Sequence, residues 1–124
     1  MDVRIKRVYD PAEESDGERV LIDRLWPRGV SHERAQIVEW IRDLGPSTEL
    51  RQWFGHDPAR FAEFRRRYEA ELAGKDAVLA DLRRRARKGR LTLVYAARDT
   101  EHNDAVVLAD VLKRRTTRGT SRAR

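Results

Sequence analysis

The chain has 124 residues, of which 40% are hydrophobic and 39% charged, with a net charge of +6 and no cysteine. This length suits one domain that buries a core of its own. The absence of cysteine excludes disulfide frameworks, thiolate metal sites, iron–sulfur clusters and cysteine nucleophiles. The longest uncharged apolar run, residues 91–97, is too short to cross a membrane. Because the N-terminus also lacks a secretory signal, we expect a cytoplasmic protein with no membrane partner.

The positive charge is concentrated at the C-terminal end of the chain. Residues 113–124 contain six basic residues and no acidic one, which leaves residues 1–112 neutral with 21 of each kind. Residues 60–90 hold a local excess of 11 basic over 5 acidic residues. We predict a single domain over residues 1–115 and a basic, disordered tail over residues 116–124. Basic helices and tails also bind phosphate backbones, so association with nucleic acid is the alternative function.

Two strands are predicted in the first quarter of the chain. Residues 3–9 alternate apolar and charged side chains, the pattern of a strand with one wet face. Pro11 ends this strand, and the acidic stretch to Glu18 is expected to be a loop. Residues 19–25 have the apolar centre of a more buried strand. Pro27 ends it, because proline cannot donate to a sheet ladder.

Polar residues mark helix starts in the middle of the chain, since their side-chain oxygens accept the orphan amide hydrogens. Ser31 is expected to cap a short helix over residues 32–36, and Ser47 a helix that runs to about Phe54. Between these two helices, residues 37–44 fit either a strand or a helix, and periodicity does not decide between them.

A further helix is predicted to start at Asp57, with Pro58 at its first position. Its apolar stripe at helical spacing consists of Phe61, Phe64, Tyr68 and Leu72. A second helix follows over about residues 76–88 and stops at Gly89.

The late part of the chain predicts a central strand followed by a last helix. Residues 91–97 are apolar on both faces, which is typical of a strand covered by helices. Asn103 is expected to cap the last helix. Strands separated by helices indicate the α/β class, and we predict a single small domain with a parallel or mixed sheet of about four strands flanked by helices.

Polar residues follow two of these strands, at 19–25 and 91–97. In α/β folds, ligands collect beyond the C-terminal ends of the strands, beside helix N-termini. If the two strands are parallel neighbours, the polar residues at and beyond their ends converge. These residues are Asp23, Arg24, Arg28, Arg98, Asp99, His102 and Asn103.

Arginine in such a place points to an anion, because its planar guanidinium binds phosphate or carboxylate bidentately. Arg24, Arg28 and Arg98 are therefore predicted to bind a small anionic ligand, such as a nucleotide or a sugar phosphate, with Asn103 at the mouth of the pocket. The alternative for Asn103 is that it serves only as a helix cap.

Asp23, Asp99 and His102 are the candidate catalytic residues, which orient the arginines or move protons. The alternative for Asp23 is a structural ion pair with Arg24. No metal site is predicted, since the chain has only three histidines and none lies at a metal-ligand spacing. Glycine-rich phosphate loops and the Gly-x-Ser-x-Gly motif are missing as well, so whether the chain is an enzyme stays open and no cofactor is indicated.

Five stretches of the sequence carry a resemblance to a known family: residues 7–11, 17–30, 46–47, 50–58 and 95–99, the last followed by His102 and Asn103. They closely resemble the YeaO-like branch of the domain-of-unknown-function 488 family, and the run Asp-Arg-Leu-Trp-Pro-Arg-Gly from Asp23 is its specific signature. The likeness covers about residues 3–113. It departs at Gly45, where alanine is usual, and at Arg98, where lysine is common. The resemblance implies a small bacterial α/β protein and implies no reaction.

Overall fold

The protein is built on one four-stranded parallel sheet. The computed structural model describes the backbone of residues 1–122 and the side chains of residues 1–114. The strand order is β1-β4-β2-β3, and every neighbouring pair is parallel. The strands are β1 (Asp2–Arg7), β2 (Glu18–Leu21), β3 (Glu39–Trp40) and β4 (Arg90–Tyr95). The predicted α/β class with about four strands is therefore confirmed.

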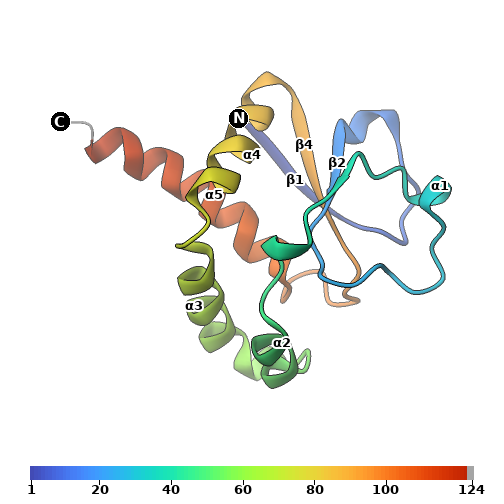
Figure 1. Ribbon diagram of the computed structural model, residues 1–124, viewed down its shortest axis with the longest axis horizontal. Helices are drawn as coiled ribbons and strands as arrows, with labels where there is room; N and C mark the ends of the chain where they lie inside the picture. Colours follow the sequence, from blue (N-terminus) through green and yellow to red (C-terminus); the bar gives the residue numbers. More distant parts are fainter. Residues whose placement is uncertain (123–124) are drawn as a thin grey trace.

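Strand β4 is central, as its apolar sequence predicts (Figure 1). Leu93 is fully buried and pairs with Ile5 of β1 on one side and with Val20 of β2 on the other. Because β2 and β4 are parallel neighbours, their carboxyl ends reach the same edge of the sheet. The sequence predicts that the polar residues converge if these two strands are parallel neighbours, and the structure meets this condition.

The long helices cover one face of the sheet, and α1 (His32–Ala35) lies on the other side (Figure 1). The long helices are α2 (Thr48–Phe54), α3 (Phe61–Leu72), α4 (Asp76–Lys88) and α5 (Asp104–Arg122). Of the predicted stripe on α3, Phe64, Tyr68 and Leu72 are buried in the larger core cluster, whereas Phe61 packs at its border. The other face carries a smaller core that includes Leu21 and Val94. Among the described residues, no helix is long and apolar enough to pass through a bilayer.

The four predicted helix caps are present. Ser31, Ser47, Asp57 and Asn103 each accept a backbone N–H from a residue two or three positions further on. Asp57 first starts a short 3-10 turn, and this turn leads into α3. Capping geometry is local, which is why sequence alone located these helix starts.

Other boundaries differ from the predictions. The predicted strand over residues 19–25 ends at Leu21, and Leu25 is 62% exposed. The reason is that the backbone carbonyl of Asp23 accepts from the Trp40 indole, and its carboxylate accepts from Ala96, so both bind outside the strand ladder. The ambiguous stretch over residues 37–44 forms the two-residue β3 followed by a 3-10 turn.

The sequence predicts a basic, disordered tail over residues 116–124. Residues 123–124 and the side chains of residues 115–122 lie outside the part that the structure describes. The tail therefore stays a prediction.

Candidate functional site

A hydrogen bond joins the loops that follow β2 and β4. The Asp23 carboxylate, two residues after β2, accepts from the backbone N–H of Ala96, one residue after β4, at 2.9 Å. This bond brings together the two segments that the sequence places at one edge. It also shows that Asp23 does not form the alternative ion pair with Arg24, because the two side chains bind different partners.

A second carboxylate, Asp104, meets Asp23 at this edge. Asp104 is the first residue of α5, and its side chain hydrogen-bonds that of Asp23. Burial raises the pKa of Asp23, and burial together with the negative charge of Asp23 raises the pKa of Asp104 well above its usual range. Two adjacent carboxyl groups cannot both ionise cheaply. The pair therefore keeps a proton at pH values where an exposed carboxyl has lost it.

Two cationic groups act on this acid pair from the end of α2. The positive charges of Arg51 and, when protonated, His56 lower the pKa of Asp23 and so oppose the effect of burial. The Arg51 Nε atom is buried and has no hydrogen-bond partner among the described residues. His56 lies in the turn beside the Asp57 cap, as predicted, and adopts a positive φ of 58°.

Asp99, His102 and Asn103 form a closed turn before α5. The Asp99 carboxylate accepts from the backbone N–H groups of Glu101 and His102 and lies 2.8 Å from the His102 Nδ1 atom. The Glu101 amide and then the His102 ring lower the pKa of Asp99. The Asn103 side chain accepts from Val106 and donates to the Asp99 carbonyl, so the structure uses it as a cap. Asp99 and His102 thus lie together, as a hydrogen-bonded pair.

The three predicted arginines are not placed alike. The Arg24 Nε atom donates to the Pro46 carbonyl at 2.7 Å, and its Nη1 atom lies 3.8 Å from Asp43. Arg24 therefore braces the turn that precedes α2. Arg28 and Arg98 are exposed and form no salt bridge with any of the side chains described.

The Arg28 and Arg98 segments contact Tyr9, in the loop after β1, and Arg7, the last residue of β1. The Tyr9 hydroxyl donates to the Arg28 carbonyl at 3.0 Å, and the Arg7 Nε atom donates to the Ala97 carbonyl at 2.9 Å. The Arg7 guanidinium stacks over the Tyr9 ring, 5.2 Å from its centre. Arg7 and Tyr9 therefore connect the loop after β2 to the loop after β4.

Sequence reasoning did not identify Asp104, Arg51 or Arg7 as site residues. Asp104 directly follows the predicted cap Asn103, at the start of the helix after the central strand. The rule that ligands gather at helix N-termini beyond strand ends would have found it. Arg51 was not identifiable in this way, because no local pattern places α2 beside the end of β2.

The fold and these contacts define a small parallel α/β domain with polar residues gathered at the carboxyl ends of its strands. The family model described as "Inactive DUF488-N3 subclade" matches residues 2–124. The chain is 48% identical over 116 residues to "Uncharacterized protein YeaO" of Escherichia coli K12, covering 91% of this chain and 98% of that protein. It is 42% identical over 113 residues to "Uncharacterized protein Rv3073c" of Mycobacterium tuberculosis H37Rv, covering 91% and 95%. No solved structure matches.

The chain therefore belongs to the DUF488 family, in its YeaO-like branch, as the sequence motifs indicate. These relatives are bacterial proteins.

Proposed function

We propose that the chain binds a small anionic, phosphate-bearing ligand at the C-terminal edge of its sheet. The observation that carries the proposal is the state of Arg28 and Arg98, which are exposed and have no salt-bridge partner among the described side chains. Their backbones are held by Tyr9 and Arg7. Both arginines thus lie in segments whose backbone is fixed by a hydrogen bond, and neither guanidinium is paired with a described carboxylate. Such guanidinium groups can bind an anion from solution.

The backbone beside Arg28 is open to such a ligand. Gly29 has a positive φ of 77°, and a Cβ atom added there would have no neighbour within 4 Å. A phosphate group can therefore approach the main chain closely at this turn. Arg51, with its buried Nε lacking a hydrogen-bond partner among the described residues, adds positive charge near the acid pair.

We assign this site to binding rather than to turnover. The matched family model carries the word "Inactive" in its description, which supports a binding role. Asp23, Asp99 and His102 are then positioning residues: Asp23 ties the loop after β4 to β2, and Asp99 with His102 shapes the turn before α5.

The alternative, association with nucleic acid, has less support from the described side chains. Most arginines of α3 and α4 lie within salt-bridge distance of carboxylates, so little free positive charge faces solvent there. The basic tail over residues 116–124 is the remaining argument for this function. If nucleic acid is the partner, deletion of this tail should weaken nucleic-acid binding and make that binding less dependent on salt concentration. If a small anion is the partner, the deletion should change nothing.

A ligand-induced rise in melting temperature tests the proposal. We expect ribose 5-phosphate, a nucleoside monophosphate or inorganic phosphate to raise the Tm of the full chain, and ribose or adenosine to leave it unchanged. Arg28→Ala and Arg98→Ala should abolish the rise. Arg87→Ala is the matched control, because Arg87 is an exposed arginine on α4 that forms no salt bridge with the described side chains. The proposal fails if no phosphorylated compound raises the Tm, or if the Arg87 variant loses the response equally.

A further inference from the structure

Strand β1 is an outer strand of the sheet, and its outer edge pairs with no other strand among the residues that the structure describes. It is six residues long, whereas β3 at the opposite edge has only two. The Val8 N–H donates to the Tyr95 carbonyl of β4, so even-numbered residues of β1 direct their N–H groups towards β4. The N–H and C=O groups of Val3, Ile5 and Arg7 therefore face the free edge. Unpaired edges of this length are templates for another strand.

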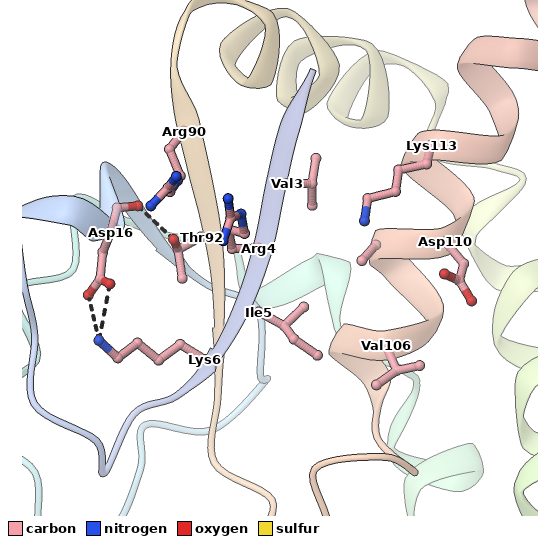
Figure 2. A pocket seen from close by; sticks show the side chains of 11 residues that line it. Val3, Arg4, Ile5, Lys6, Asp16, Arg90, Thr92, Val106, Asp110 and Lys113 are labelled. Atoms are coloured by element: carbon pink, nitrogen blue, oxygen red, sulfur yellow. Dashed lines mark hydrogen bonds and ion pairs between the residues drawn. The ribbon is translucent and has the colours of Figure 1, made fainter.

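A groove of about 500 Å³ runs along this free edge and includes side chains from both faces of β1 (Figure 2). On one face, Val3 and Ile5 point towards α5, whose Val106 and Ala109 also line the groove. On the other face lie the polar side chains of Arg4, Lys6, Thr92 and Arg90. An extended strand fits such a groove, provided that its side chains alternate between apolar and charged.

The polar side of the groove is electrically balanced. Its lining cations are Arg4, Lys6 and Arg90, and each of them lies within salt-bridge distance of a carboxylate of the same chain, which is Asp2, Glu13 or Asp16. Asp2 lies 2.9 Å from both Arg4 and Arg90. Like charge at an edge strand repels a second strand. Because Arg4, Lys6 and Arg90 are paired with carboxylates of their own chain, they give this edge little of that protection.

We propose that a second copy of the chain adds its β1 antiparallel to this β1, so that two four-stranded sheets join into one across a two-fold axis. The sequence of β1 is the occupant that the groove requires, since it alternates charged and apolar residues. In an antiparallel pair, a residue whose backbone N–H and C=O groups point towards the partner strand must lie opposite a residue of the same kind. Val3 opposite Ile5 satisfies this condition, because the backbone N–H and C=O groups of both residues point towards the free edge.

This register also matches charges between the two copies. With Val3 opposite Ile5, Asp2 of each copy lies opposite Lys6 of the other, and the two Arg4 side chains oppose each other at the axis. Each Arg4 keeps the Asp2 carboxylate of its own chain at 2.9 Å, which offsets this one repulsive pair. Opposite charges directly across a strand pair stabilise it, and like charges destabilise it. A shift by two residues towards the C-terminus would instead place Arg4 opposite Lys6. The charge pattern therefore disfavours that shifted register, which contains two like-charge pairs.

Helix α5 supplies the rest of the interface. A pair of six-residue strands buries less than the roughly 1,200–2,000 Å² of a typical stable interface. Helix α5 flanks the groove through Val106 and Ala109, on the same face as Val3. The two-fold arrangement places the α5 helices of both copies on one face of the joined sheet, where their groove-lining side chains extend the contact.

Charge-swap variants test this register in the full chain. Asp2→Lys places lysine opposite Lys6 of a second identical chain, and Lys6→Asp places aspartate opposite Asp2. Sedimentation velocity should therefore show that each variant raises the dimer Kd about tenfold, because each homodimer contains two like-charge pairs. An equimolar mixture should restore the wild-type Kd, since both cross-strand pairs become attractive in the mixed dimer. Glu33→Lys and Arg34→Asp reverse exposed charges on α1, which lies away from β1 (Figure 1), and should leave the Kd unchanged.

The mixture separates lost pairing from lost folding, because two misfolded chains cannot rescue each other. The proposal is overturned if the wild-type chain stays monomeric at millimolar concentration, if both variants dimerise like the wild type, or if their mixture fails to recover dimers.

Discussion

Arginine is used differently in the α3–α4 layer and at the C-terminal edge of the sheet. On α3, Arg66 and Arg67 both bind Glu63, within one helical turn, and lower the pKa of that carboxyl to about 2. At the sheet edge, Arg28 and Arg98 have no salt bridge among the described side chains. The same residue type is thus neutralised by its own helix in one region and left available in the other.

The carboxylates show the same contrast in reverse. In the helical layer, Asp81 meets Arg84 and Arg85, whereas at the edge Asp23 meets another carboxylate, Asp104. The difference teaches that an excess of basic residues does not by itself locate an anion site. What locates it is the failure of nearby opposite charges to pair, and unsatisfied charge of this kind gathers at functional sites.

The largest effect on the free energy of unfolding is expected in the core that joins the α3–α4 layer to the sheet. Leu93→Ala truncates a fully buried side chain of β4, which packs under the helices and fixes the register of β2. We expect a loss of about 2–5 kcal/mol in the free energy of unfolding. Urea denaturation measures it. A loss below about 1 kcal/mol would mean that β4 is not the centre of the core.

The acid pair predicts how stability changes with pH. A carboxyl group with a raised folded-state pKa binds more protons folded than unfolded, so the free energy of unfolding falls as pH rises from the unfolded pKa through the raised one. Asp104→Asn mimics the protonated form, and should stabilise the chain by about 1–3 kcal/mol at pH 8 while flattening this fall. Thermal unfolding between pH 4 and pH 9 tests it, with Asp110→Asn as the exposed control. An unchanged slope contradicts the shared proton.

In the helical layer, Arg85 is the best-connected cation. It lies 2.9 Å from Glu18, 2.8 Å from Glu39 and 3.1 Å from Asp81, and so ties α4 to β2 and β3. We expect Arg85→Ala to cost about 1–2 kcal/mol, more than an isolated surface pair, and to cost less in high salt. Denaturation with and without added salt measures both effects. Equal losses for Arg85→Ala and Arg84→Ala would show that the network adds nothing.

The smallest effect on stability is expected at the sheet edge. Arg28→Ala and Arg98→Ala remove side chains without a salt bridge among those described, so each should change the free energy of unfolding by less than about 0.5 kcal/mol. The same variants should lose the stabilisation by phosphorylated ligands. If either variant destabilises the free protein as much as Arg85→Ala does, the contrast between the two regions is wrong.

The sequence predicts the parts of this molecule that depend on local chemistry. The caps at Ser47 and Asn103, the apolar stripe of α3 and the buried run of β4 follow from side-chain oxygens and periodicity. The parallel pairing of β2 with β4 could be stated only as a condition from the sequence, because no local signal reveals which strands are neighbours.

The candidate site was predicted only in part, for the same reason. Asp23, Asp99, His102 and Asn103 do gather around the loop after β4. The partner of Asp23 is Asp104, however, and Arg24 turns to Pro46. Whether Asp23 or Arg24 faces the site depends on where β2 stops pairing with its neighbouring strands. It stops at Leu21, four residues before the predicted end at residue 25.

The position of β4 has a consequence for how the chain acquires its structure during synthesis. Asp2 pairs with Arg90, 88 residues later, and β2 also waits for β4. Contacts of such long sequence separation slow folding, because the loop must close before the pairing stabilises it. On a ribosome, β1 emerges without a neighbour and β2 can pair only with the two-residue β3, so the sheet is completed only after β4 has been translated. During that interval the unpaired edges of these strands are open to aggregation.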